Sequence, residues 1–258
     1  MVHGSDLRSI RGWDSVFDCE AARDLLNNNG LGDVESVFAN GATAQRRHDG
    51  RTVWDTQLVA DDGELVHVYV KMNWGRLQFW PRMTDLKTGQ WLQSMPIREW
   101  KGIGELKSLG LNVPQRLAVF HTGILSFRAA VIVRAIPLRE SVRAMLASGE
   151  WQRLAGEQRE HILDRMVEVM RTIHAAGLGW RGSSLGHFYP QLDADGGWKI
   201  WLIDCEGVHR RATQRTFDRD FRKLTRSFEI VGAEPSTLNM LERCIRRSEV
   251  ASKKSKAA

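Results

Sequence analysis

The sequence has few cysteines and no long apolar run, and each shortage excludes a class of protein. Cys19, Cys205 and Cys244 are far apart, so we expect neither a disulfide framework nor a zinc site. The longest apolar run, Ala129–Val133, falls far short of the roughly 20 residues that a transmembrane helix needs. The N-terminus also lacks the basic, apolar and small-residue order of a secretory signal. We therefore expect a cytoplasmic protein with reduced thiols.

Acidic residues do not outnumber basic ones, and the net charge is +6. A basic chain attracts polyanions such as nucleotides, anionic lipid surfaces or nucleic acid. Nucleic acid is disfavoured, because no recognition-helix, RNA-binding or zinc-finger pattern accompanies the charge. Part of the excess lies in residues 249–258, which we expect to be a disordered basic tail. The 258 residues suffice for one large domain or for two lobes.

The first half of the chain has the patterns of a β-sheet. Residues 1–33 are expected to be a lead-in with one short helix, and residues 34–38 to be a strand. Thr52–Val59 and Leu65–Met72 flank Asp-Asp-Gly, which is a strong hairpin signal. In the second of these runs, alternation places two sets of side chains on opposite faces. One face carries Leu65, His67, Tyr69 and Lys71, and the other carries Val66, Val68 and Val70.

Helical periodicity begins after residue 95 and dominates from Pro137 onwards. A helix is predicted from Arg98 to Leu109, with Glu99 and Glu105 as its acidic candidates. Two more strands, 116–121 and 128–136, precede Pro137. The later predicted helices share an apolar stripe at helical spacing, and they cover residues 142–146, 158–176, 219–228 and 236–247. His174 lies near the apolar stripe of its helix, so we expect a packed structural histidine.

Two further stretches combine chemistry-bearing residues. Between Asn73 and Met95, cations alternate with large aromatic residues, an arrangement that suits either an anionic membrane surface or an ordered loop at a sheet edge. From Ile173 to Gly207, a helix leads through a polar loop and a hairpin to an apolar strand that ends at Asp204. A carboxylate in that place can hold Mg²⁺ or can simply cap the following turn.

Several short motifs occur in one order along the chain, and together they carry a resemblance. The motifs are Val68–Lys71, Arg98–Trp100, Ile173–Gly177, Leu185–Phe188, Leu202–Asp204 and Arg219–Leu224. In this order the chain resembles the lipopolysaccharide core heptose and Kdo kinases over roughly residues 34–245. The resemblance implies an α+β, bilobal protein-kinase-like fold. Residues 34–136 would form an N-lobe with an antiparallel sheet and one helix, and residues 137–248 a mainly helical C-lobe.

The resemblance also implies roles for several of these residues. Lys71 would hold the α- and β-phosphates of ATP and Glu99 would fix its ammonium group, with Glu105 as the alternative partner. Asp204 and His187 would hold Mg²⁺, and Asn40 and Gly41 would stand at the phosphate loop. Alternatives from the residues themselves are an exposed edge lysine for Lys71 and a structural hydrogen-bonding role for His187.

The loop that contains Arg181 departs from the family pattern. Trp180-Arg181-Gly182 stands where the family has His-Arg-Asp, so Gly182 occupies the place of the general base. Tyr69 also stands where a small residue usually leaves room for adenine. A general base contributes roughly 10²–10⁴ in rate, and Glu206 is a possible substitute. The sequence thus favours a weakened ATP- and Mg²⁺-dependent kinase of a sugar or glycolipid. The alternative is a nucleotide-binding pseudokinase or scaffold. Peripheral contact with the inner membrane face is compatible with either hypothesis.

Overall fold

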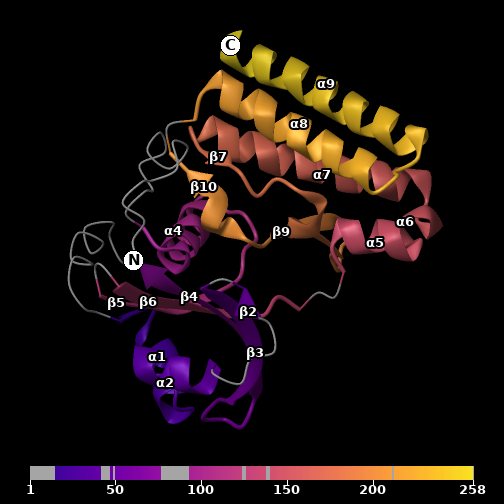
Figure 1. Ribbon diagram of the computed structural model, residues 1–258. Coiled ribbons are helices and arrows are strands. Elements are labelled where there is room, and N and C mark those ends of the chain that lie inside the picture. Colours follow the sequence, from indigo (N-terminus) through magenta and orange to yellow (C-terminus); the bar gives the residue numbers. More distant parts are fainter. Residues whose placement is uncertain are drawn as a thin grey trace. The chain divides into compact units, whose positions relative to one another are not determined.

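The computed structural model describes residues 15–41, 47–48, 50–76, 93–123, 126–137, 140–210 and 212–257. The chain divides into two compact units. The first unit comprises residues 1–103 and 114–135, and the second comprises residues 104–113 and 136–258. Helix α4 (Met95–Ser108) runs from the first unit into the second. Figure 1 shows the order of the elements along the chain.

The first unit is built on an antiparallel sheet whose described strands run in the order β1-β5-β6-β4-β3-β2. The strands are β1 (Val16–Phe17), β2 (Arg47–His48), β3 (Arg51–Val59), β4 (Leu65–Arg76), β5 (Arg116–Thr122) and β6 (Ser126–Arg134). The predicted hairpin is present, because Val59 pairs with Leu65 across the Asp-Asp-Gly turn. The predicted strands at 116–121 and 128–136 correspond to β5 and β6.

The two faces of β4 differ as the alternation predicts. Val66, Val68 and Val70 are at most 5% exposed, whereas Leu65 is 58% and Tyr69 40% exposed. The buried valines form one hydrophobic cluster with residues of α1 (Glu20–Asn28) and α2 (Val34–Asn40). These two helices lie together against the sheet (Figure 1). The face that carries Lys71 is therefore not the face that α1 and α2 cover.

The prediction of a strand at residues 34–38 is wrong, because this segment is helix α2. Val34, Val37 and Phe38 are spaced i, i+3 and i+4, which is a helical period that the short segment concealed. Asp33 begins the helix as its N-cap, since Asp33 Oδ1 accepts a 2.8 Å hydrogen bond from the Ser36 amide. The same contact lowers the pKa of Asp33.

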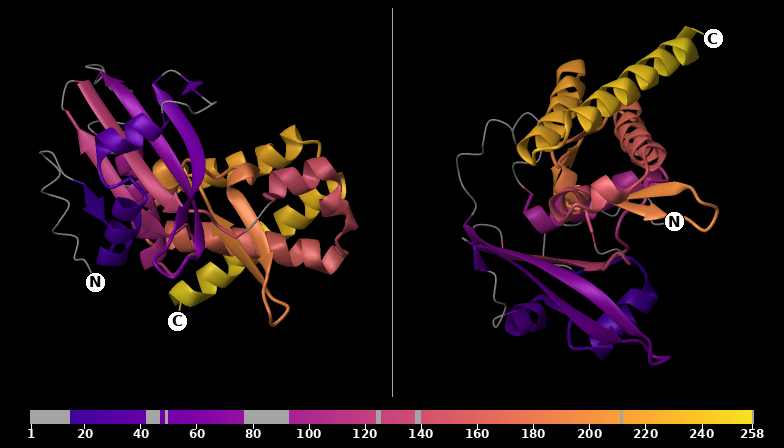
Figure 2. Two further views of the ribbon diagram at one scale, coloured as in Figure 1. Left: turned by 90° about the horizontal axis from the view of Figure 1, so that it is seen from below. Right: turned by 90° about the vertical axis from the view of Figure 1, so that its right-hand side faces the viewer.

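The second unit contains helices and two small antiparallel pairs of strands. Its helices are α5 (Val142–Ser148), α6 (Glu150–Arg153), α7 (Gly156–Ala175), α8 (Gln214–Ile230) and α9 (Pro235–Ala257). The strand pairs are β7 (Gly179–Trp180) with β10 (Val208–His209), and β8 (Phe188–Leu192) with β9 (Trp198–Leu202). Figure 2 shows the β8–β9 hairpin, in orange, projecting from the helices of this unit.

Helix α7 is the centre of the second unit. Its apolar stripe, which includes Ile162, Met166 and Ile173, is fully buried. Helices α7 and α9 run side by side (Figures 1 and 2). His174 lies in the same stripe, is 6% exposed and stacks on Phe217 at 4.2 Å between ring centroids. The prediction of a packed structural histidine is thus confirmed.

Helix α9 continues to Ala257, through residues whose composition predicts a disordered basic tail. Lysine and alanine are strong helix formers, and lysines near the C-terminus of a helix interact favourably with its dipole. The composition of the tail is therefore compatible with an extension of α9. None of the described helices is long and apolar enough to cross a bilayer.

Candidate functional site

The first part of the candidate site is an ion pair within the first unit. Lys71, on β4, places its Nζ atom 2.9 Å from Oε1 of Glu99, on α4. The Glu99 side chain is 2% exposed and the Lys71 side chain 26% exposed. A carboxylate buried to this degree is costly unless it is paired. The buried glutamate therefore fixes the direction of the lysine, whose side chain stays partly exposed.

The register of α4 explains why Glu99 is the partner of Lys71. Trp100, Ile103 and Leu106 are buried at helical spacing, and Glu99 lies beside this apolar stripe. Glu105, the alternative partner, instead accepts hydrogen bonds from Arg210 at 2.6 and 3.0 Å. Glu99 is therefore the partner of Lys71, and Glu105 is the partner of Arg210.

The expected phosphate loop begins at Asn40 and Gly41, and both residues have other contacts. Asn40 is the last residue of α2, and its Nδ2 donates to the carbonyl groups of Gly30 and Ser36. Gly41 packs so closely that a Cβ atom there would lie 2.5 Å from Sδ of Met72. The remainder of this expected loop lies outside the described residues. Nothing in these contacts assigns Asn40 or Gly41 to phosphate.

The second part of the candidate site lies in the second unit, where β9 ends. Asp204 adopts the left-handed backbone conformation, with φ 58°, and no other described non-glycine residue has a positive φ. Such a conformation is strained for a residue with a side chain and is enriched at functional sites. The short helix η4 (Cys205–Gly207) follows at once, and Glu206 lies within it. The Asp204 carboxylate is 36% exposed and directed towards His187.

His187 is oriented by the loop that precedes it. The residue ends the short helix η3 (Leu185–His187), and its Nδ1 atom lies 2.6 Å from the carbonyl oxygen of Gly182. A carbonyl can only accept, so Nδ1 carries the proton and Nε2 is the atom free to act as a ligand. Nε2 lies 3.4 Å from Oδ2 of Asp204. One imidazole nitrogen and one carboxylate oxygen therefore converge, which is a donor set that fits a divalent cation.

Trp180 fills the space beside Gly182. The indole is fully buried, contacts Phe188 edge to face at 5.2 Å, and places Nε1 3.3 Å from the carbonyl oxygen of Asp204. A Cβ atom on residue 182 would lie 2.4 Å from Nε1 of Trp180 and 3.0 Å from the Asp204 carbonyl oxygen. The Trp180 indole therefore occupies the space that a side chain at residue 182 would need.

A buried carboxylate on α8 holds this loop in position. Asp220 is 0% exposed and accepts a 3.0 Å hydrogen bond from the Trp180 amide and a 2.7 Å hydrogen bond from Arg219. Burial alone would raise the pKa of Asp220, but His174, Arg219 and the Trp180 amide outweigh it and lower the pKa. Lys223, also on α8, donates to the Arg181 carbonyl oxygen. Sequence reasoning assigned no role to Asp220 or Lys223, because their contacts lie about 40 residues away in the chain.

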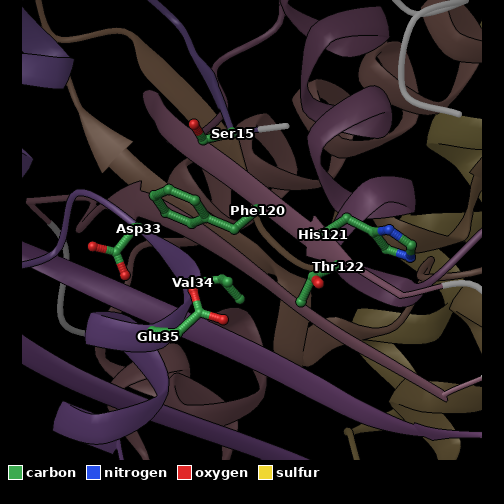
Figure 3. Close-up of a pocket in the computed structure, with 7 residues that line it drawn as sticks. All are labelled: Ser15, Asp33, Val34, Glu35, Phe120, His121 and Thr122. Carbon is green, nitrogen blue, oxygen red and sulfur yellow. The ribbon is translucent and has the colours of Figure 1, made fainter. Parts of the chain in front are cut away.

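A cavity of about 380 Å³ also lies in the first unit, between β5 and the start of α2. Figure 3 shows Phe120 at its centre, with Asp33 and Glu35 on one side and the His121 ring on the other. Burial lowers the pKa of His121, so this imidazole is neutral near pH 7. Two carboxylates in the lining oppose the binding of a polyphosphate. The cavity is therefore separate from the Lys71–Glu99 pair in both position and chemistry.

Comparison with known proteins places these two parts in one family. Residues 39–249 match the profile of the lipopolysaccharide kinase (Kdo/WaaP) family. The chain belongs to the lipopolysaccharide kinase (Kdo/WaaP) family. The family has sugar kinase activity, and Lys71, Glu99, His187 and Asp204 all lie within the matched residues. No protein of curated function matches the chain at a significant level.

A solved structure shows the same fold. The chain is similar to WaaP, solved in complex with acyl carrier protein, with a TM-score of 0.61 and 20% sequence identity. The similarity covers 91% of this chain and 89% of the WaaP chain. The fold is thus α+β and protein-kinase-like, as the order of the motifs predicts. At this level of identity the likeness establishes the fold and leaves the roles of individual residues to be tested.

Proposed function

We propose that the chain is an ATP- and Mg²⁺-dependent phosphotransferase that acts on a hydroxyl group of a sugar or glycolipid. The observation that carries the proposal is the 2.9 Å pair between Lys71 and the buried Glu99. Phosphoryl transfer needs fixed positive charge at the phosphates more than it needs covalent chemistry. A lysine that is held by a buried carboxylate supplies such a charge at low reorganisation cost.

The metal side of the proposed site rests on Asp204 and His187. Nδ1 of His187 donates to the Gly182 carbonyl oxygen, and Nε2, on the other side of the ring, lies 3.4 Å from the Asp204 carboxylate. These two residues would hold the cation, which when bound neutralises charge on the transferring phosphoryl group. Arg181 would contribute further positive charge from the same loop. Ile203 donates a 3.2 Å backbone hydrogen bond to the His187 carbonyl, which ties the two ligand-bearing segments together.

Gly182 sets the expected rate of this reaction. Without a general base in this place, transfer loses roughly 10²–10⁴ in rate. Charge neutralisation and alignment supply the larger share of phosphoryl-transfer catalysis, so slow transfer is the expected behaviour. Glu206 lies two residues beyond Asp204 and is the acidic residue to test as a substitute. Glu206→Gln would lower a residual rate if that carboxylate receives the proton.

Transfer of label from [γ-³²P]ATP to lipopolysaccharide core oligosaccharides tests the proposal. Wild-type protein is expected to label the acceptor in the presence of Mg²⁺, and Lys71→Met to lower the rate at least a hundredfold. Lys101→Met, which changes a lysine on α4 next to Trp100, is the matched control and should retain most of the activity. If wild type and Lys71→Met label acceptors equally, or neither does, the proposed reaction is refuted.

The alternative is a pseudokinase that binds nucleotide without transfer, and the buried Trp180 beside Gly182 favours it. An ATP-dependent rise in melting temperature without turnover would support this alternative.

The WaaP structure contains acyl carrier protein, so a carrier protein is a further partner to test by co-sedimentation with this chain. The membrane contact suggested for residues 73–95 lies mostly outside the described residues. Unchanged liposome sedimentation of Trp80→Ala/Arg82→Glu would exclude that contact.

A further inference from the structure

Lys223 lies on the edge of α8 that contacts the loop containing Gly182. Its position is rotated by about 60° around the helix axis from Asp220, which belongs to the buried side of the helix. The Lys223 ammonium donates a hydrogen bond to the carbonyl oxygen of Arg181. That carbonyl belongs to the peptide bond that joins Arg181 to Gly182. The ammonium group is therefore next to the residue that stands in the place of the general base.

The Lys223 ammonium has more donors than the described residues use. A lysine ammonium has three N–H donors, and one of them is bound to the Arg181 carbonyl oxygen. No salt bridge from Lys223 to a carboxylate is found among the described residues. Asp220, on the same helix, already accepts hydrogen bonds from the Trp180 amide and from Arg219. Within the described part of the chain, two N–H groups of Lys223 thus remain for a ligand.

The surroundings of Lys223 suit a fixed positive charge near the proposed metal site. The residue is exposed, so a ligand can reach it. Partial burial lowers the pKa of Lys223, as does the charge of Arg219, and the carboxylates of Asp220 and Asp204 oppose this shift. Lys223 is therefore within electrostatic range of Asp204, the proposed metal ligand.

We propose that Lys223 is a further cation of the transfer site and that its ammonium binds oxygens of the γ-phosphoryl group during transfer. This inference rests on the proposed function. The acceptor oxygen bonds to the γ-phosphorus, the bond to the bridging oxygen of ADP breaks, and the hydroxyl proton passes to solvent. The negative charge of the transition state is spread over the other three oxygens of the phosphoryl group. An ammonium with unused donors stabilises this charge without accepting a proton.

The glycine at residue 182 makes the charge of Lys223 available for this role. An aspartate in that place would bring a negative charge close to the ammonium and would offset it. With glycine there, the positive charge acts on the phosphoryl group instead. Lys223 thus compensates in part for the missing base by stabilising charge rather than by moving a proton.

Three variants of the full chain separate the charge of Lys223 from its support of the loop. Lys223→Gln removes the charge but keeps a side-chain N–H that can donate to the Arg181 carbonyl, and glutamine keeps the helix propensity. Lys223→Arg keeps the charge. Arg222→Gln is the matched control, because it removes the same charge from an exposed residue on the opposite side of α8. All three variants should melt within about 2 °C of the wild type.

The first measurement is the rate of label transfer from radiolabelled ATP to a core oligosaccharide. Lys223→Gln should lower kcat about a hundredfold and change the KM for ATP by less than about threefold. Lys223→Arg should lose less than about tenfold, and Arg222→Gln should match the wild type. A wild-type kcat for Lys223→Gln overturns the inference. An equal loss in Lys223→Gln and Lys223→Arg, or in Lys223→Gln and Arg222→Gln, also overturns it.

The second measurement needs no acceptor. MgADP with aluminium fluoride imitates the nucleotide and the transferring phosphoryl group, and its affinity is compared with that of MgADP alone. The wild type should gain about a hundredfold in affinity from the fluoride. Lys223→Gln should lose most of this gain while its affinity for MgADP alone stays unchanged. The same gain in both proteins, or no gain in the wild type, overturns the inference.

The two measurements also separate this inference from the proposed function. If wild type and Lys223→Gln transfer phosphate equally, the proposed function stands and the inference about Lys223 fails. If no protein labels the oligosaccharide but the fluoride gain depends on Lys223, the inference stands and the proposed reaction fails.

Discussion

Trp180 and Gly182 should be energetically coupled, and Gly182→Ala is the smallest change that reveals it. A Cβ atom on residue 182 would lie 2.4 Å from Nε1 and 2.9 Å from Cε2 of Trp180. Favourable contacts between heavy atoms lie near 3.5–4.0 Å, so the indole would have to move by about 1 Å. It is fully buried against Phe188, and moving it disturbs the core. Overpacking of this kind costs typically about 1–3 kcal/mol.

The assay is a double-mutant cycle in thermal and urea unfolding. Gly182→Ala should lower the melting temperature by about 4–8 °C, taking about 2 kcal/mol and about 2–4 °C per kcal/mol. Trp180→Leu ends the side chain before the positions of the two clashing atoms, so the double variant should be at least about 1 kcal/mol more stable than the sum of the single changes predicts. Gly186→Ala is the control, because its Cβ would have its nearest neighbour, Arg143 Cδ, at 3.9 Å.

Wild-type stability of Gly182→Ala, or strict additivity in the cycle, would refute this reasoning. The cycle also bears on catalysis. Gly182→Asp alone would place a carboxylate where the indole already lies, so it is a poor test of the missing base. Trp180→Leu/Gly182→Asp provides the room, and this double variant should transfer phosphate faster than Trp180→Leu alone if only the base is missing.

Three further predictions follow from buried and paired groups. Asp220→Asn should lower the free energy of unfolding by about 2 kcal/mol and loosen the loop at Trp180. The folded-state pKa of Asp220 is lowered, so the stabilisation by its ionised carboxylate is present above about pH 4 and is lost on further acidification. Below about pH 4, the stability of the variant should therefore depend less on pH than that of the wild type. His187→Asn should reduce the preference of the ATP-loaded protein for Mn²⁺ over Mg²⁺, measured by thermal shift, because an amide oxygen is a harder ligand than imidazole; an unchanged ratio would contradict a ligand role. Cys19 is exposed, whereas burial raises the pKa of Cys244 to about 12, so a thiol reagent should modify Cys19 in the native protein and Cys244 only after unfolding.

Elements with a strong local pattern could be predicted from the sequence. The alternation in β4 placed Lys71 on the face opposite the buried valines. The family resemblance offered Glu99 as its partner and Glu105 as the alternative, and the structure pairs Lys71 with Glu99. The β8–β9 hairpin followed from the glycine-rich turn at residues 193–197, where Asp193 and Gly197 are joined by a backbone hydrogen bond. In each case the information lies within about ten residues.

Elements that depend on competing or distant interactions could not be predicted. Helix α2 is short, and three apolar residues followed by Asn-Gly suit a strand as well as a helix. The position of the Trp180 indole beside Gly182 depends on its hydrogen bond to the carbonyl oxygen of Asp204, which is 24 residues away. The strained backbone of Asp204 likewise follows from tertiary contacts and has no local signal.

The proposed function requires that Lys71 and Asp204 each contribute to nucleotide binding. The most direct test is ATP affinity, measured with and without Mg²⁺, for wild type, Lys71→Met and Asp204→Asn. Lys71→Met should weaken ATP binding in both conditions, and Asp204→Asn should abolish only the gain in affinity that Mg²⁺ provides. Equal affinity of all three proteins for ATP, with no effect of Mg²⁺, would contradict the roles proposed for Lys71 and Asp204.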